Sequence, residues 1–465
     1  MRSTTLTMFF AAMPALFGIV GCAPFQQYRT AQNDDCVCNV KDADAKCGTH
    51  MIQHIKTDNE NIFQLGFIEF DDQGQLWDRD RQKSHVIGTI ARIGETQDLL
   101  MVVFVHGWKH SAAPDDGNIN TFRDVLSDLT DAEAAMSKLK GVQARAVFGV
   151  YLGWRGESIA LPVVDNITFW DRKNTAHKVG NGGVTEVLSE LERIRDKQPD
   201  RGRDGNRTKL AVIGHSFGGA VVFSALSQIM ENRLVASKHG LQENRIKGFG
   251  DIVVLINPAF EATRYTPLAD MSTEVKTYDG QQFPILAILT SEADWATKYA
   301  FKIGRYLSTG FEANRVMTRY NPTTDLSEQV NQKQASVTAV GHFSNYQTHT
   351  LKPISGQEIR VLDAPKIDVG KRVQYLLDAS DSWQNDQPGG DIQFGQVLLH
   401  RNKTSAAHDP YLVAYVDKHL ITDHNDIDDP RVVEFIKQLI LLSSHSKKEV
   451  DQARLMLKHQ PHPDK

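Results

Sequence analysis

The chain has 465 residues and a formal net charge of −5, and its lysines and arginines are dispersed along the sequence. This distribution excludes a basic face for nucleic acid and a polybasic stretch for an anionic membrane surface. Hydrophobic residues at 41% and charged residues at 23% are ordinary for a globular protein. Beyond the N-terminus, no apolar run is long enough to span a bilayer. The length fits one large α/β core with an extension.

The N-terminus has the pattern of an export signal. Residues 1–7 carry one arginine, residues 8–20 are apolar, and Ile-Val-Gly-Cys follows at 19–22. These four residues resemble the lipobox of bacterial lipoproteins, whose cysteine is acylated and becomes the mature N-terminus. The resemblance implies a signal peptide over 1–21, a lipid anchor on Cys22, and an outer-membrane location facing the periplasm or the exterior, because Ala23 is not the aspartate that retains such proteins in the inner membrane. An ordinary cleaved signal with an incidental cysteine is the alternative.

Residues 22–60 lack periodicity, so we expect a polar tether between anchor and folded core. The tether contains Cys36, Cys38 and Cys47. In an oxidising compartment they allow one disulfide and one spare thiol, most easily Cys47 with Cys36 or Cys38. A zinc site is the alternative, but the sequence has no paired Cys-x-x-Cys spacing here. Only His50 and His54 could supply a fourth ligand, so we do not expect zinc here, and the serine chemistry described below needs no metal or cofactor.

The strongest chemical signal is Gly-His-Ser-Phe-Gly at residues 214–218. An apolar run at 210–213 has the length of a buried strand, and residues 218–226 have helical spacing. So sharp a turn from strand to helix forces its middle residue, Ser216, into a strained backbone conformation, and the flanking glycines leave room for the crossing chains. The helix that follows points its N–H groups at the same place. Ser216 is therefore the predicted nucleophile.

Apolar strands and helical patterns alternate along much of the chain. This order predicts a parallel sheet covered on both faces. The first strand is expected to begin a hairpin at a sheet edge that extends to residue 77. The expected strands are 62–70, 99–105, 142–154, 210–213, 251–256, 284–289 and 411–416, and the expected helices are 119–129, 184–194, 218–226, 295–301 and 431–442.

This order of elements, with His-Gly-Trp after the strand 99–105 and the glycine-flanked serine after a later strand, resembles the α/β-hydrolase superfamily over about 61–445. In that family, the loop after the earlier strand and the residue after the nucleophile donate the two oxyanion N–H groups. The resemblance therefore assigns Trp108 and Phe217 to an oxyanion hole. It implies a mostly parallel α/β-hydrolase sheet with helices on both faces, formed by a core at 61–309 and by a last strand and helix at 410–445.

A serine nucleophile needs a base, and the base needs an orienting acid. Asp294 is the predicted acid, because it follows the strand 284–289 and opens a helical segment. If Asp294 only caps that helix, Glu292 or Asp417 would be the acid.

Two histidines compete for the role of base. His424 lies between the strand 411–416 and the helix 431–442, and the α/β-hydrolase fold ends in this way. His342 follows a short strand but lacks a closing helix, so we favour His424, keep His342 as the alternative, and rank His349 third.

If His424 is the base, residues 310–409 are an insertion between acid and base. Their composition predicts a loop-rich lid or a wall of the acyl pocket, and residues 446–465 are expected to be a polar tail. Trp154, Arg155, Phe169 and Trp170 either line the substrate cleft or pack structurally.

The predicted function is hydrolysis of carboxylic esters by a serine esterase or lipase-like enzyme, acting on a small ester or a lipid at the bacterial envelope. A thioesterase, peptidase or acyltransferase would use the same triad. The alternative of another class is a non-catalytic scaffold that binds an envelope partner.

Overall fold

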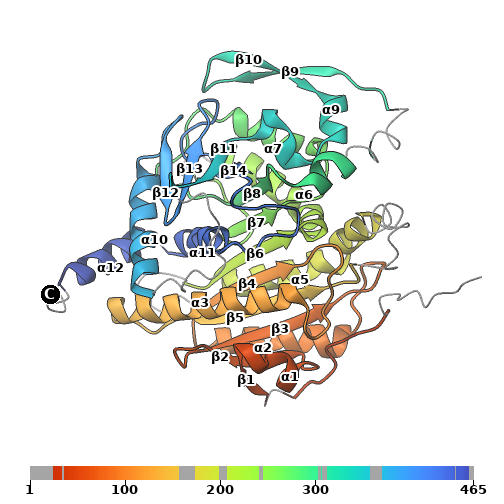
Figure 1. Ribbon diagram of the computed structural model, residues 1–465, viewed down its shortest axis with the longest axis vertical. Coiled ribbons are helices and arrows are strands. Elements are labelled where there is room, and N and C mark those ends of the chain that lie inside the picture. Colours follow the sequence, from red (N-terminus) through yellow and green to blue (C-terminus); the bar gives the residue numbers. More distant parts are fainter. Residues whose placement is uncertain are drawn as a thin grey trace, which may run out of the picture.

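The computed structural model describes residues 25–33, 36–156, 173–197, 207–239, 245–301, 305, 312–356, 369–445 and 447–459. The fold is α/β, with a 12-stranded, mostly parallel sheet at its centre (Figure 1). The strand order is β1-β2-β3-β5-β4-β6-β7-β8-β14-β11-β13-β12. The strands are β1 (Val37–Asn39), β2 (Ile52–Lys56), β3 (Ile62–Glu69), β4 (Leu99–Val105), β5 (Ala146–Gly153), β6 (Lys209–His215), β7 (Ile252–Ile256), β8 (Leu286–Ser291), β11 (His349–Pro353), β12 (Asp391–Phe394), β13 (Val397–Arg401) and β14 (Tyr411–Val416).

From β3 to β11, each strand in the sheet runs parallel to its neighbour. The strands of this parallel part therefore all end on the same side of the sheet. We call this side the carboxyl edge, as distinct from the lateral edges formed by β1 and β12. Loops at this edge of a parallel sheet are where functional side chains gather.

Helices cover both faces of the sheet, because the central strands are apolar on both sides. In β4, Leu99, Met101 and Val103 enter one core, and the residues between them enter the other. One face carries α2 (Ser84–Gly94), α5 (Thr185–Lys197), α6 (Phe217–His239) and α7 (Ala262–Thr273), and the other carries α1 (Ala43–Cys47), α3 (Gly117–Lys140), α10 (Val369–Gln384), α11 (Pro430–Ser444) and α12 (Lys447–His459).

Shorter elements connect these layers or project from them. Figure 1 shows the two-stranded hairpin of β9 and β10 projecting from one end of the molecule. The shorter elements are β9 (Val316–Asn321), β10 (Leu326–Asn331), α9 (Gln332–Val337), η1 (Val40–Asp42), η2 (Arg79–Lys83), η3 (Gly180–Val184), η4 (Ala296–Ala300), η5 (Val340–His342) and η6 (Ser344–Tyr346). Within the described part of the chain, no helix is both long enough and apolar enough to cross a membrane.

The alternation of strands and helices predicted from the sequence is confirmed in the parallel part of the sheet. The boundaries differ by a few residues. Helix α3, for example, begins after Asp116, whose carboxylate accepts a hydrogen bond from the Asn118 N–H, and it continues to Lys140, much further than the predicted 119–129. Asp116 is therefore the N-cap of α3.

The prediction of a polar tether over residues 22–60 is wrong for the part of this stretch that the structure describes. Residues 37–56 contribute β1 and β2, and β2 pairs antiparallel with β3. The prediction of an edge hairpin starting at β3 is wrong for the same reason, since β3 lies between β2 and β5 and only a single bridge joins Phe70 to Leu76. Strands of three and five residues carry too few apolar positions to show a period in the sequence.

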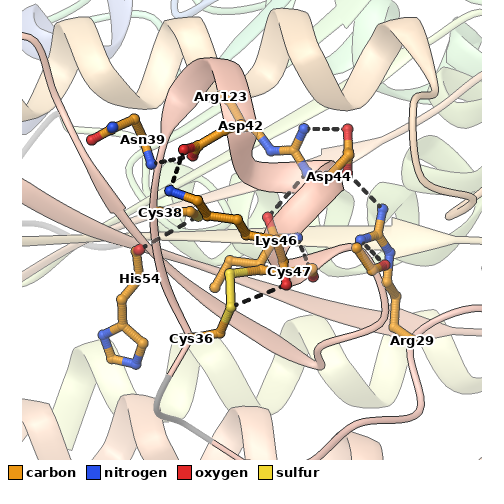
Figure 2. Close-up of a disulfide and its surroundings, with 12 residues drawn as sticks. Arg29, Cys36, Cys38, Asn39, Asp42, Asp44, Lys46, Cys47, His54 and Arg123 are labelled. Atoms are coloured by element: carbon orange, nitrogen blue, oxygen red, sulfur yellow. Dashed lines mark hydrogen bonds and ion pairs between the residues drawn. A yellow bond between two sulfur atoms is a disulfide. The ribbon is translucent and has the colours of Figure 1, made fainter.

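A disulfide closes a loop within this N-terminal region, and a buried ion pair joins the region to α3 (Figure 2). Cys36 and Cys47 form the disulfide, which is one of the two pairings predicted. Cys38 is a free, buried thiol, and burial raises its pKa to about 11. Both Nη atoms of Arg123 in α3 lie 2.6 Å from the Asp44 carboxylate. Among the described residues, Cys36, Cys47 and His50 have ligand atoms close enough to hold a metal, but the disulfide engages both sulfurs.

The described part of the predicted insertion is richer in regular structure than a loop-rich lid. Strand β11 pairs parallel with β14, and β13 and β12 extend the sheet beyond it with antiparallel pairing. Helix α10 contacts α3 and α11. The prediction of a loop-rich insertion is therefore wrong for β11 to β13, which belong to the sheet. Each of these strands has only four or five residues, and their pairing is not local in sequence.

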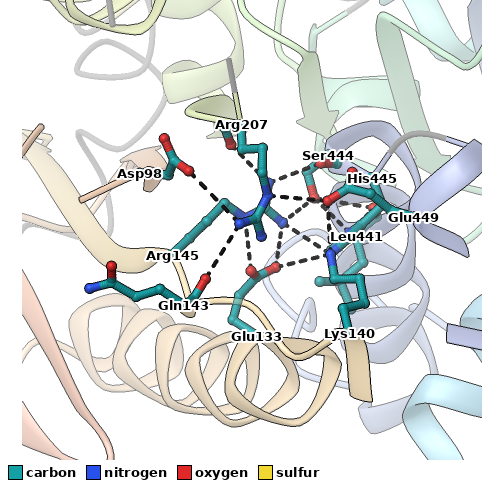
Figure 3. A network of polar contacts seen from close by, with 10 residues as sticks. All are labelled: Asp98, Glu133, Lys140, Gln143, Arg145, Arg207, Leu441, Ser444, His445 and Glu449. Carbon is teal, nitrogen blue, oxygen red and sulfur yellow. Dashed lines mark hydrogen bonds and ion pairs between the residues drawn. The ribbon is translucent and has the colours of Figure 1, made fainter. Parts of the chain in front are cut away.

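A buried network of charges joins the C-terminal helices to the side of the sheet opposite the carboxyl edge, where β4, β5 and β6 begin (Figure 3). Arg145 Nε donates to Glu133 at 2.8 Å, and Arg145 Nη1 donates to the Ser444 carbonyl at 2.9 Å. Burial alone would raise the pKa of Glu133, but Arg145 and His445 lower it to about 2. Glu449 of α12 bonds Lys140 at 2.8 Å, so the predicted polar tail is an ordered helix up to residue 459.

We expect Arg145→Met to destabilise the protein by about 3–5 kcal/mol, because it leaves the Glu133 carboxylate buried without its partner. The double variant Glu133→Gln/Arg145→Met should recover at least half of this loss. Urea unfolding of the two variants and the wild type at neutral pH measures the difference. Equal destabilisation of the single and double variants would contradict the view that the unpaired carboxylate is the cause.

Candidate active site

The backbone at Ser216 has the strained conformation that the sequence predicts. Strand β6 ends at His215, α6 begins at Phe217, and Ser216 between them has a φ of 55°. A positive φ is costly for a residue with a side chain. A Cβ atom on Gly218 would lie 2.0 Å from the Val105 carbonyl oxygen, so only glycine fits there. The Ser216 N–H donates to the Ile256 carbonyl at 2.9 Å, which ties the turn to β7.

Three side chains that follow the carboxyl ends of β6, β8 and β14 meet at this point. Ser216 Oγ lies 2.6 Å from His424 Nε2, and His424 Nδ1 lies 2.9 Å from Asp294 Oδ1. Asp294 is fully buried, and Ser216 is 2% exposed. Strand β14, which precedes His424, pairs parallel with β8, which precedes Asp294. The structure therefore brings together Ser216, Asp294 and His424, the favoured residues of the sequence analysis.

Two further side chains hold the loop of His424 by its backbone. His215 Nε2 lies 3.0 Å from the His424 carbonyl oxygen, and Asn257 Nδ2 donates to the same oxygen at 2.9 Å. Burial lowers the pKa of His215 to about 3, so its ring is neutral and Nε2 carries the hydrogen that the carbonyl accepts. Asn257 Oδ1 in turn accepts from the Ser291 N–H at 2.9 Å.

Neither His215 nor Asn257 was predicted from the sequence to be a site residue. The sequence does contain a signal for Asn257, because this asparagine directly follows the apolar run 252–256 at a strand end. In the structure it has a φ of 45°, a region that asparagine tolerates better than most residues.

Asp294 both caps a helical turn and orients the histidine, so the two roles are not alternatives. Its Oδ1 accepts from the Thr297 N–H at 3.0 Å, and its Oδ2 accepts from the Thr297 hydroxyl. Burial disfavours the charged carboxylate, but His424 and the hydrogen bonds from Thr297 outweigh burial and hold the pKa of Asp294 below its ordinary value. The alternative acid Asp417 bonds His419, and the Glu292 backbone N–H bonds the Val416 carbonyl. No contact of either carboxylate with His424 is seen among the described residues.

His342, the alternative base, lies behind the acid instead of beside the serine. Its Nε2 is 3.0 Å from Thr297 Oγ1. Because the Thr297 hydroxyl donates its hydrogen to Asp294, it accepts from His342, whose Nε2 must carry a hydrogen. Burial lowers the pKa of His342 to about 4, so the ring is neutral near pH 7. A chain of hydrogen bonds therefore runs from His342 through Thr297, Asp294 and His424 to Ser216. The third candidate, His349, is buried in β11 and bonds Thr348.

The loop after β4 lies directly against the serine. A Cβ atom on Gly107 would lie 2.8 Å from Ser216 Cβ. The neighbouring His106 is buried, accepts from the Trp154 N–H at 3.0 Å, and stacks on the Trp154 ring with an interplanar angle of 7°. These contacts fix the loop to the end of β5. They also show that Trp154 has the packing role, which was one of the two roles expected for it.

The remaining predicted residues fall into two groups. Trp108 follows Gly107 in the loop after β4, and Phe217 is the first residue of α6, directly after Ser216. Phe169, Trp170, the predicted lipidation site Cys22 and the signal peptide 1–21 lie outside the described residues.

Comparisons of the chain with protein-family models, with curated proteins and with solved structures found no match. The functional assignment of this site therefore depends on its residues and their geometry.

The contribution of Thr297 can be tested with a matched pair of variants. Thr297→Val removes the hydroxyl bond to Asp294 Oδ2, so the pKa of Asp294 should rise and the carboxylate should be lost at a higher pH as the solution is acidified. Since a hydrogen bond to a charged group contributes about 1.5–3 kcal/mol, the titration profile of the Asp294 carboxyl, followed by carbon NMR, should move up by about 1–2 pH units.

The control is Thr297→Ser, which keeps the hydroxyl and should restore the wild-type profile. A Thr297→Val variant that loses stability but keeps the wild-type pH profile would reduce Thr297 to a packing residue.

Proposed function

We propose that the protein is a serine hydrolase of the α/β-hydrolase type that cleaves carboxylic esters. The observation that carries the proposal is the line of hydrogen bonds from Ser216 Oγ through His424 to Asp294, with distances of 2.6 and 2.9 Å. A base within hydrogen-bond reach of a nucleophile, oriented by a buried acid through its other nitrogen, is the geometry that activates a serine hydroxyl. The strained turn at Ser216 and the parallel order of β3 to β8 support the same assignment.

The chemistry follows from these positions. Ser216 Oγ attacks the ester carbonyl while His424 Nε2 takes its proton, and the negative charge moves to the carbonyl oxygen. The backbone N–H groups of Trp108 and Phe217, with the positive end of α6, are the proposed partners of that oxygen. His424 then protonates the leaving alcohol. Water, deprotonated by the same histidine, cleaves the acyl-serine ester and returns the hydroxyl to Ser216.

Part of the stretch between Asp294 and His424 also contributes to the proposed site. His342 belongs to η5, and it contacts the acid side of the triad through Thr297. We assign to this part of residues 310–409 the role of a wall behind the acid, in place of the covering lid that the sequence suggested.

The triad is tested by covalent labelling and by turnover of a water-soluble ester such as p-nitrophenyl butyrate. A fluorophosphonate should label the wild-type protein at Ser216 and leave Ser216→Ala unlabelled. Because triad members act as a unit, Ser216→Ala and His424→Ala should each lower turnover by about 10⁴-fold or more. His342→Ala, which leaves the serine and its base in place, should have a much smaller effect.

Folded wild-type protein that neither reacts with the fluorophosphonate nor hydrolyses esters would favour the alternative of a non-catalytic binding scaffold. A His424→Ala variant that keeps most of its turnover would remove the histidine from the mechanism.

We also propose that Cys22 anchors the enzyme to the bacterial envelope, on the support of the Ile-Val-Gly-Cys sequence at 19–22. Several acyl chains, each contributing about 0.8 kcal/mol per buried methylene, would hold the protein firmly on the membrane. Mass spectrometry of the mature N-terminus should find a lipid-modified cysteine, and Cys22→Ala should release the protein from the membrane or leave it unprocessed. An unmodified mature N-terminus would overturn the anchor.

A further inference from the structure

The chain that follows the proposed anchor is fixed to the folded core within a few residues. The Arg29 side chain is fully buried, its Nε donates to the Ala112 carbonyl at 2.7 Å, and its guanidinium lies 4.0 Å from the centre of the Phe67 ring. The backbone N–H groups of Tyr28 and Arg29 both donate to the buried Glu69 carboxylate at 2.9 Å. This segment therefore cannot act as a loose tether.

Phe25 lies next to the loop that touches the serine. Its ring is 55% exposed and lies 4.8 Å from the Trp77 ring, centre to centre, and the Arg155 guanidinium lies 5.1 Å from it. The residues on either side of Arg155 are bonded to that loop, Trp154 to His106 and Gly156 to the His110 carbonyl. Phe25 thus marks one flank of the proposed active site, at the carboxyl edge.

Cys22 is three residues before Phe25 in the sequence. Since an extended chain covers at most about 3.3–3.6 Å per residue, a lipid on Cys22 would hold this flank within about 11 Å of its attachment point. The membrane surface would therefore lie beside the loop that contains Gly107, instead of at the distance a long tether would allow.

Exposed aromatic side chains also lie on the other flank. Trp295 and Tyr299 follow Asp294 after the end of β8, are 64% and 50% exposed, and have ring centres 6.3 Å apart. The Nζ of Lys298, between them in sequence, lies 5.7 Å from the Tyr299 ring. Tryptophan and tyrosine with a nearby lysine are the side chains that favour the boundary between membrane and water.

We infer that the carboxyl edge of the sheet, from Phe25 to Trp295, docks on the membrane that carries the Cys22 lipid, and that the site takes its ester substrate from that bilayer. Strands β3 and β8 end at this edge on either side of β6, so Ser216 lies between the two aromatic flanks. This inference rests on the proposed ester hydrolysis and on the anchor. It adds the partner, a lipid surface, and the substrate class, ester lipids resident in that surface.

The first test measures docking without using activity. The lipidated protein is reconstituted on phosphatidylethanolamine/phosphatidylglycerol vesicles that contain lipids brominated near the headgroup. Part of the tryptophan emission should be quenched, and Trp295→Phe should remove a component of that quenching. The same quenched fraction in wild type and Trp295→Phe would overturn the docking of this flank.

The second test compares two substrates, an ester lipid embedded in the vesicles and water-soluble p-nitrophenyl butyrate. Trp295→Ala/Tyr299→Ala, and separately a flexible Gly/Ser insertion of about 20 residues between Ala23 and Pro24, should each lower turnover of the embedded lipid about tenfold or more, since both weaken the hold on the interface. Turnover of the soluble ester should stay within about twofold of wild type.

The matched control is Met456→Ala. This residue is 51% exposed on α12, which is bonded to Arg207 just before the start of β6, at the opposite edge from Ser216. It should change neither rate. Equal turnover of the embedded lipid in wild type and in the aromatic and insertion variants would refute the inference, whereas loss of fluorophosphonate labelling and of both ester activities in the wild type would refute the proposed function instead.

Discussion

The backbone of Ser216 is the constraint on which the arrangement of the site depends. A positive φ at a residue with a side chain costs on the order of 1–3 kcal/mol, and it persists only where the surroundings over-determine it. Here β4 and β7 confine β6 from both sides, the Ser216 N–H is bonded to the Ile256 carbonyl, and the Val105 carbonyl closes on Gly218 so tightly that a side chain there is impossible. The parallel sheet is therefore the rigid body that stores this strain and presents the hydroxyl.

The other two members of the triad depend on the same sheet. Asp294 and His424 follow β8 and β14, which are hydrogen-bonded neighbours, so the acid and the base are placed by one strand register. The base needs more than its strand, because it lies eight residues beyond the end of β14. His215 and Asn257, at the ends of β6 and β7, fix the position of the His424 loop by hydrogen bonding to the His424 carbonyl oxygen. The histidine loop is thus held to the same strand ends that carry the serine.

The parts of the structure that could be predicted are those with local signals. The Gly-x-Ser-x-Gly turn, the fully apolar run of β4 and the position of Asp294 at a strand end each depend on a few adjacent residues. Local signals separate His424 from His342 only weakly, because both histidines reach the surroundings of Asp294. His424 does so directly, and His342 does so through Thr297.

What could not be predicted depends on contacts between distant parts of the chain. Strands β1, β2 and β11 to β13 are short, and their pairing joins segments with no shared local pattern. In the sequence, the N-terminal region has the pattern of a tether. Its order comes from the contacts of Arg29, Arg123 and Glu69 and from the disulfide, and a single sequence does not reveal such partners.

The position of β14 in the middle of the sheet has a consequence for how the molecule assembles. This strand comes near the end of the chain, yet it lies between β8 and β11, and both of these are made before it. Until β14 arrives, each of them presents an unpaired edge, which is where chains associate wrongly. The segment that closes this gap is also the one that delivers His424. The pairing of β14 therefore completes the sheet and brings His424 to the triad in the same step. A chain in which β14 has not yet paired lacks its catalytic base.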